Sequence, residues 1–257
     1  MEKQTKKTNS SEPLDLSDAH IHDVLKQRKA SGKPLVIYKG VDGALYSDNG
    51  QSLWRVVDEK RFKVPEGVTV ICDRAFYKCH PLRRVTFPIS LKVIGNEVFW
   101  HCKKLQSVDL PPNLVAIGEF AFNYCWDIES MYIPSSVKEI GRSAFSFCMS
   151  LTWINIPEGV TVIRESTFFW CIALTDVSIP KSVRKIERFA FDGCKALKSI
   201  YIPNSVRTIG ERVFHFCESL ERIEIPKGTL KKFAKLLPDD QDKLVEIDIA
   251  GHHSKVW

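Results

Sequence analysis

The chain has 257 residues, and 44% of them are hydrophobic, which is enough to build a continuous core. Its formal charge of +6 is mild and does not by itself indicate a nucleic acid or an anionic membrane as partner. No run of 18 apolar residues occurs, so the sequence predicts no membrane-spanning helix.

Residues 1–33 are predicted to be a flexible leader that contains a short helix. Ser17 is a suitable N-cap, and Gly32 followed by Pro34 is a stop signal. The first twenty residues lack the apolar stretch of a secretory signal, so a cytoplasmic location is favoured. Residues 34–63 are predicted to be a β-hairpin cap, because Asp48-Asn49-Gly50 is a hairpin turn signal between two apolar-rich runs.

Residues 64–226 repeat a 23-residue pattern seven times. Self-similarity at a period of about 20 to 50 residues is typical of a solenoid, in which each repeat forms one coil. A proline recurs at this period from Pro65 to Pro226. The repeated phenylalanines are Phe76, Phe99, Phe122, Phe145, Phe168, Phe191 and Phe214. The repeated cysteines are Cys79, Cys102, Cys125, Cys148, Cys171, Cys194 and Cys217.

Each repeat contains two apolar segments. The stretch from Leu151 to Ile156 alternates apolar and polar residues, as a half-buried strand does. The pair Val137 and Ile140 precedes it and ends at a turn with Gly141. One coil cannot bury its own apolar face, so neighbouring coils must stack and the ends need caps. Residues 227–257 are predicted to be a helical cap and tail, with Phe233 on the buried side of the helix.

The repeated pattern L-x-x-I-x-I-P-x-S-V-x-x-I-G-x-x-A-F-x-x-C resembles the BspA-type leucine-rich repeat of bacterial and protozoan surface proteins. The C-terminal segment resembles the tails of such proteins in Bacteroidetes. The resemblance implies a right-handed coil with parallel strands on a concave face, where recognition takes place. It also implies adhesion, with a cell-surface or secreted location as the alternative to the cytoplasm.

Two surfaces are candidates for binding. On the concave face, exposed Tyr and Trp beside polar groups are typical anchors of protein contacts, although a merely solvated sheet face would look the same. The concave-face candidates are Arg84, Asp109, Tyr132, Trp153, Asn155, Asp176, Tyr201 and Arg222. A second set of rings, near the repeated cysteine, would form an aromatic edge that either binds a partner or packs on itself. The edge candidates are Trp100, Tyr124, Trp126, Phe147, Phe169 and Trp170.

The sequence gives little sign of an enzyme. Histidine and cysteine spacings do not match a metal site, and no nucleotide-binding or nucleophile motif is present. Seven cysteines at one repeat position favour buried, reduced thiols. A basic cluster is interpreted as a solvated convex face, not a phosphate site. Its members are Lys181, Arg184, Lys185, Arg188, Arg207 and Arg212.

We therefore predict a non-catalytic scaffold that binds a partner, most simply a protein. It is expected to need no cofactor or metal, and to bind no nucleic acid and insert into no membrane. A surface adhesin for a host matrix protein or carbohydrate is the first alternative. A self-associating structural protein that uses the aromatic edge is the second.

Overall fold

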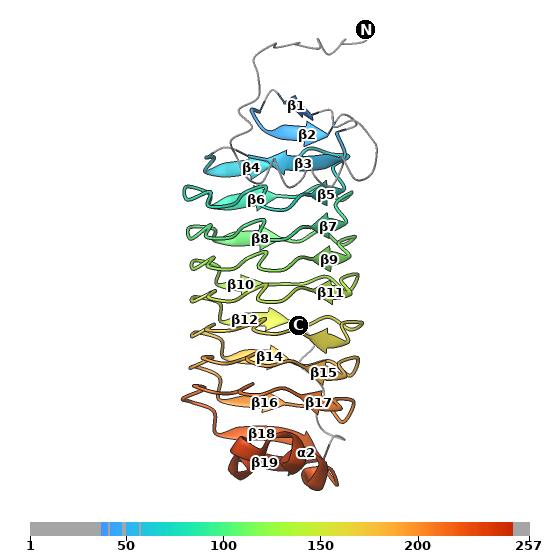
Figure 1. The fold of residues 1–257 in the computed structure, drawn as a ribbon, viewed down its shortest axis with the longest axis vertical. Coiled ribbons are helices and arrows are strands. Elements are labelled where there is room, and N and C mark those ends of the chain that lie inside the picture. Colours follow the sequence, from blue (N-terminus) through green and yellow to red (C-terminus); the bar gives the residue numbers. More distant parts are fainter. Residues whose placement is uncertain (1–36, 41, 48–49, 57, 249–257) are drawn as a thin grey trace. The chain divides into compact units, whose positions relative to one another are not determined.

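The computed structural model describes residues 37–40, 42–47, 50–56 and 58–248. Within this part, seven coils of 23 residues stack along one direction, and a partial turn precedes them (Figure 1). The predicted leader, its helix and the last residues of the tail lie outside the described residues. Among the residues described, no helix has both the length and the apolar character that a membrane span needs.

Each coil contributes one odd-numbered and one even-numbered strand. The odd strands are β5 (Val70–Ile71), β7 (Val93–Ile94), β9 (Ala116–Ile117), β11 (Glu139–Ile140), β13 (Val162–Ile163), β15 (Lys185–Ile186) and β17 (Thr208–Ile209). The even strands are β6 (Arg84–Thr86), β8 (Ser107–Asp109), β10 (Ser130–Met131), β12 (Trp153–Asn155), β14 (Asp176–Ser178), β16 (Ser199–Tyr201) and β18 (Arg222–Pro226).

The strands pair in parallel between neighbouring coils, in the register of the sequence repeat. Arg84, for example, lies opposite Ser107, which is one repeat further along. The even strands form the sheets β4-β6-β8 and β10-β12-β14, with β4 at Arg61–Lys63, and the sheet β16-β18, which the C-terminal strand β19 (Leu244–Ile247) extends. The odd strands run from β3 (Ser52–Arg55) to β11 in one sheet and from β13 to β17 in another. The predicted leucine-rich repeat solenoid is thereby confirmed.

The repeated phenylalanines and cysteines run in two files through the core. Neighbouring phenyl rings stack with centroids 4.9 to 5.8 Å apart, and six of the seven phenylalanines are fully buried. In the cysteine file, Cys148 Sγ donates to the carbonyl oxygen of Phe122 in the preceding coil, over 3.3 Å. The same bond recurs at every cysteine from Cys102 to Cys217. The thiol therefore gives a buried carbonyl a partner, and none of the eight cysteines forms a disulfide.

A five-residue turn segment lies between the odd strand and the cysteine of each coil. It spans residues 74–78 in coil 1 and 212–216 in coil 7. Its first and last residues have positive φ in every coil, for example 61° at Arg74 and 56° at Lys78. Left-handed backbone is costly for residues other than glycine. Three N–H groups of each segment in coils 1 to 6 donate to the next coil, and these bonds offset that cost.

The two ends of the stack differ. At the N-terminal end, β1 (Ile37–Lys39), β2 (Leu45–Ser47) and β3 (Ser52–Arg55) pair antiparallel, and β3 then pairs in parallel with β5. At the C-terminal end, α2 (Leu230–Leu236) and the 3₁₀ helix η1 (Pro238–Lys243) lead to β19 (Leu244–Ile247), which pairs with β18. Phe233 of α2 is fully buried, so this helix covers the end of the core.

Candidate binding surfaces

The outward side chains of the even strands form a continuous surface, which we call the even-strand face. At its centre Tyr132 is 60% exposed, and Trp153 on the next coil is half-buried. Trp153 lies opposite Ser130 in the parallel register, and Tyr132 follows two residues after Ser130, so the two rings are diagonal neighbours on adjacent coils. The structure thus brings the two predicted aromatic anchors to neighbouring positions.

Asn155, which was predicted to contact a partner, has a role inside the chain. Its amide oxygen accepts the N–H of Ile133 at 2.7 Å, and its amide nitrogen donates to the Ile133 carbonyl at 2.8 Å. The side chain therefore acts as one rung of a backbone ladder. Ile133 directly follows Tyr132, so Asn155 holds the backbone next to the exposed ring.

Charged residues lie towards both ends of the even-strand face, and Asp176 lies beside Trp153 at its centre. Arg84 and Asp109 are 3.6 Å apart on neighbouring coils, and both side chains are largely exposed. Arg222 lies 3.1 Å from the carboxylate of Glu224, on its own strand. The other predicted members of this face are exposed Asp176 and half-buried Tyr201. Burial raises the pKa of the Tyr201 phenol.

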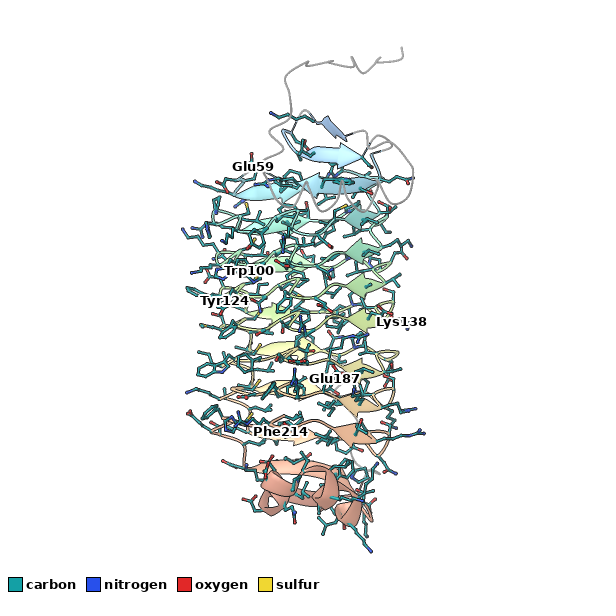
Figure 2. All side chains as sticks on the ribbon, viewed as in Figure 1. Glu59, Trp100, Tyr124, Lys138, Glu187 and Phe214 are labelled. Atoms are coloured by element: carbon teal, nitrogen blue, oxygen red, sulfur yellow. The ribbon has the colours of Figure 1, made fainter. Side chains whose placement is uncertain are left out.

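The rings of the aromatic edge stack on one another. In the position before the cysteine, centroids are 4.3 Å apart from His101 to Tyr124, 4.4 Å from Tyr124 to Phe147, and 6.5 Å from Phe147 to Trp170. All six predicted edge residues are half-buried. Figure 2 shows Trp100 and Tyr124 on one edge of the stack, opposite Lys138. Of the two alternatives left open by the sequence, this geometry favours packing.

Lysines occupy several of the remaining ring faces. Lys103 Nζ lies 3.8 Å from a ring centroid of Trp126, and Lys195 Nζ lies 5.4 Å from that of Trp170. Such cation–π contacts cover the ring surface that a ligand would need. The aromatic edge is therefore already occupied in large part by the chain's own side chains.

Phe216 is the exception among these rings, and it was not predicted as a site residue. It fills the position before Cys217 and is 55% exposed. The equivalent residue one coil earlier is Gly193, whose φ is +77° and whose Cα faces the indole of Trp170. Glycine offers no ring to stack on, so Phe216 stands outside the ladder. In the sequence, Gly193 interrupts the aromatic residues that fill the position before the cysteine, and this was the signal that could have identified Phe216.

The core thiols are held protonated, and part of the basic cluster is paired. Among the residues that the structure describes, no group of three or more His, Cys, Asp or Glu is arranged to hold a metal ion. Burial raises the pKa of Cys171 and of Cys217 to about 12, which disfavours the nucleophilic thiolate. In the predicted basic cluster, Lys185 pairs with Glu187 at 2.8 Å.

Comparison with known proteins agrees with this architecture. The family model of the BspA type leucine rich repeat region matches residues 56–175 and 161–256, in six copies. The chain belongs to the BspA-type leucine-rich repeat family. BspA-type solenoids are in general binding scaffolds without catalytic activity. Among curated proteins, no match was found.

Three solved structures illustrate the similarity of this BspA-type chain to bacterial proteins. A leucine rich cell surface protein from Faecalibacterium prausnitzii is 30% identical, with a TM-score of 0.69 over 76% of this chain and 55% of that protein. A leucine rich repeat protein from T. pallidum is 27% identical, with a TM-score of 0.64 over 79% of this chain and 95% of that one. A leucine-rich repeat protein from Eubacterium ventriosum shares the fold at 22% identity and a TM-score of 0.62, over 71% of this chain and 50% of that one.

Proposed function

We propose that this BspA-type chain is a non-catalytic scaffold that binds another protein through its even-strand face, with Tyr132 and Trp153 at the centre of the contact. The observation that carries the proposal is the 60% exposure of Tyr132 beside half-buried Trp153, both at the surface of a parallel sheet. Aromatic side chains of this kind contribute much of the binding energy in protein interfaces.

Rigidity supports the same proposal. The backbone on either side of Tyr132 is tied to its neighbours, by strand pairing at Met131 and by Asn155 at Ile133. A preorganised surface loses little conformational entropy on binding, so more of the contact energy appears as affinity. The charged residues towards the ends of the face would form a polar rim, as in other protein interfaces.

The test compares two matched double variants in capture of a partner from an extract of the source cells. Tyr132→Ala with Trp153→Ala should abolish capture, because two interface hot spots weaken binding by at least about 2 kcal/mol each. Phe147→Ala with Trp170→Ala, on the aromatic edge, should retain it. Thermal unfolding of both variants shows whether each is folded. Capture that survives the first double variant and is lost in the second would assign the site to the edge instead.

A second candidate is attachment at a cell surface. It is favoured by the 30% identity to the F. prausnitzii protein, which is described as a cell surface protein. Antibody labelling of source cells before and after permeabilisation distinguishes a location on the cell surface from one inside the cell. Labelling of intact cells would support attachment, and labelling only after permeabilisation would contradict it.

A further inference from the structure

The turn segments form a regular hydrogen-bond ladder along the stack. In every coil from 1 to 6, three alternate N–H groups donate to carbonyl oxygens of the next coil. Between coils 6 and 7 the donors are Phe189, Phe191 and Gly193, and the acceptors are Glu211, Val213 and His215, at 3.1, 3.1 and 2.8 Å. The structure therefore defines what each turn segment binds: a neighbouring backbone that presents three carbonyls at alternate residues.

In coil 7 this ladder has no partner. The equivalent N–H groups belong to Arg212, Phe214 and Phe216. None of the three donates a hydrogen bond to an acceptor in the part of the chain that the structure describes. Alternating unpaired donors of this kind are a template for the backbone of another segment.

The C-terminal cap explains why the edge stays open. Strand β19 pairs with β18 and so supplies the even strand of an eighth coil. Helices α2 and η1 take the place of its odd strand and turn segment. None of the N–H groups of Arg212, Phe214 and Phe216 donates to a carbonyl of residues 230–243, so these helices offer coil 7 no ladder of carbonyls. The cap completes the eighth coil on one side only.

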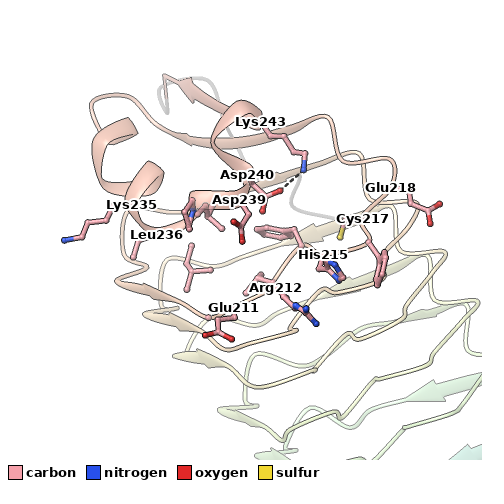
Figure 3. A pocket seen from close by; sticks show the side chains of 17 residues that line it. Glu211, Arg212, His215, Cys217, Glu218, Lys235, Leu236, Asp239, Asp240 and Lys243 are labelled. Atoms are coloured by element: carbon pink, nitrogen blue, oxygen red, sulfur yellow. Dashed lines mark hydrogen bonds and ion pairs between the residues drawn. The ribbon is translucent and has the colours of Figure 1, made fainter.

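A cavity of about 770 Å³ lies at the open edge, between the turn segment of coil 7 and the α2–η1 cap (Figure 3). Arg212, Phe214 and Phe216 all line it. Leu236 and Pro238 contribute apolar surface from the cap side. Acidic and basic side chains are nearly balanced around the cavity: Glu211, Glu218, Asp239 and Asp240 against Arg212, Lys235 and Lys243.

We propose that this cavity binds a peptide segment of a partner protein that takes the same turn conformation as residues 211–215, whose carbonyls accept the N–H groups of coil 6. Main-chain carbonyls of the peptide accept the N–H groups of Arg212, Phe214 and Phe216, and an apolar side chain of the peptide packs on the exposed Phe216 ring. The balanced charge of the lining argues against recognition of a free ion, and the spacing of the donors matches a polypeptide backbone. This site is separate from the even-strand face and does not depend on the proposed function.

The first test is amide hydrogen exchange on the free, full-length protein. The N–H groups of Arg212, Phe214 and Phe216 should exchange at least about tenfold faster than their counterparts in coil 6, since only the latter have acceptors. Equal protection in the two coils would overturn the proposal, because it would mean that the edge is already filled.

The second test uses a synthetic peptide of residues 207–218 with Cys217→Ser. This peptide carries the three carbonyls that coil 6 meets in the intact chain. Added up to about 1 mM, the weak end of specific recognition, it should shift and protect the amides of Arg212, Phe214 and Phe216 in a saturable way. A scrambled peptide should not.

Phe216→Asn should weaken peptide binding about tenfold by removing the ring, while asparagine still tolerates the positive φ of this position. Lys78→Asn is the matched control: it changes the same slot of coil 1, also at positive φ, and should leave the affinity unchanged. Three outcomes would each overturn the proposal: no saturable binding, full affinity in Phe216→Asn, or shifts confined to the even-strand face.

Discussion

Raising the pH should unfold this protein in a range where most proteins stay folded, because its core contains a file of buried thiols. Burial raises the pKa of each thiol from Cys102 to Cys217, to about 12 at Cys171 and Cys217. Unfolded cysteine titrates near pH ~8.5. The folded state therefore keeps protons that the unfolded state releases, and stability is full below pH ~8.5 and falls as the pH rises towards the folded pKa.

The magnitude follows from linkage. Each thiol that is protonated only in the folded state lowers the free energy of unfolding by about 1.4 kcal/mol per pH unit above pH ~8.5. One thiol therefore costs about 2 kcal/mol at pH ~10, and the six together cost about 12 kcal/mol. Folded domains are stable by only about 5–15 kcal/mol, so we expect alkaline unfolding near pH ~10.

Urea unfolding followed by circular dichroism, in reductant at several pH values from neutral to pH ~10, measures this slope. Cys148→Ala removes one titrating group and should reduce the slope by about one proton, although it lowers stability at neutral pH. Phe145→Leu is the control, since it weakens the core without removing a thiol. It should lower the free energy of unfolding by the same amount at every pH. A free energy of unfolding that is flat from pH ~7 to ~10 would refute the reasoning, because it would mean that the thiols are not protected.

Three further substitutions test the packing of the stack by equilibrium unfolding. Asn155→Ala should lower the free energy of unfolding by about 2–3 kcal/mol, because it leaves the N–H and carbonyl of Ile133 without partners. A loss below about 0.5 kcal/mol would argue against the hydrogen bonds to Ile133. Gly193→Ala should lower the free energy of unfolding by about 1–2 kcal/mol, because φ at this position is +77° and a Cβ would lie 2.9 Å from the Trp170 ring. Unchanged stability and unchanged Trp fluorescence would contradict that contact. Phe168→Ala should cost about 3–5 kcal/mol, the usual effect of deleting a fully buried phenyl ring, and a loss under about 1 kcal/mol would place Phe168 outside the core.

The sequence was sufficient to predict the stack because its period is strict. A residue that recurs every 23 positions occupies the same place in every coil, so one pattern predicts both the strand register and the files of Phe168 and Cys171. The outward direction of Tyr132 follows from the alternation of strand residues in the same way.

Other features could not be predicted because they depend on backbone conformation. The slot that holds Tyr124 and Trp170 has positive φ throughout, yet most of its residues are not the glycine or asparagine that signal such a turn. In the sequence Asn155 resembles any outward polar residue of a strand, and its two bonds to Ile133 are seen only in the folded structure. The sequence predicts a helical cap after Pro226, but nothing in it predicts that three N–H groups of coil 7 are left without acceptors among the described residues.

The open edge at coil 7 follows from how a repeat protein ends. Each coil of a solenoid is stabilised mainly by its two neighbours, so the last coil requires a substitute for the missing one. The helical substitute in this chain buries apolar surface, as Phe233 does, but it presents no ladder of carbonyls to coil 7. Water can satisfy the leftover donors at the cavity, at the loss of the bonds that every earlier coil makes. A segment that supplied three carbonyls would restore those bonds. The end of the repeat is therefore also the place where the chain has backbone N–H groups available to bind a partner.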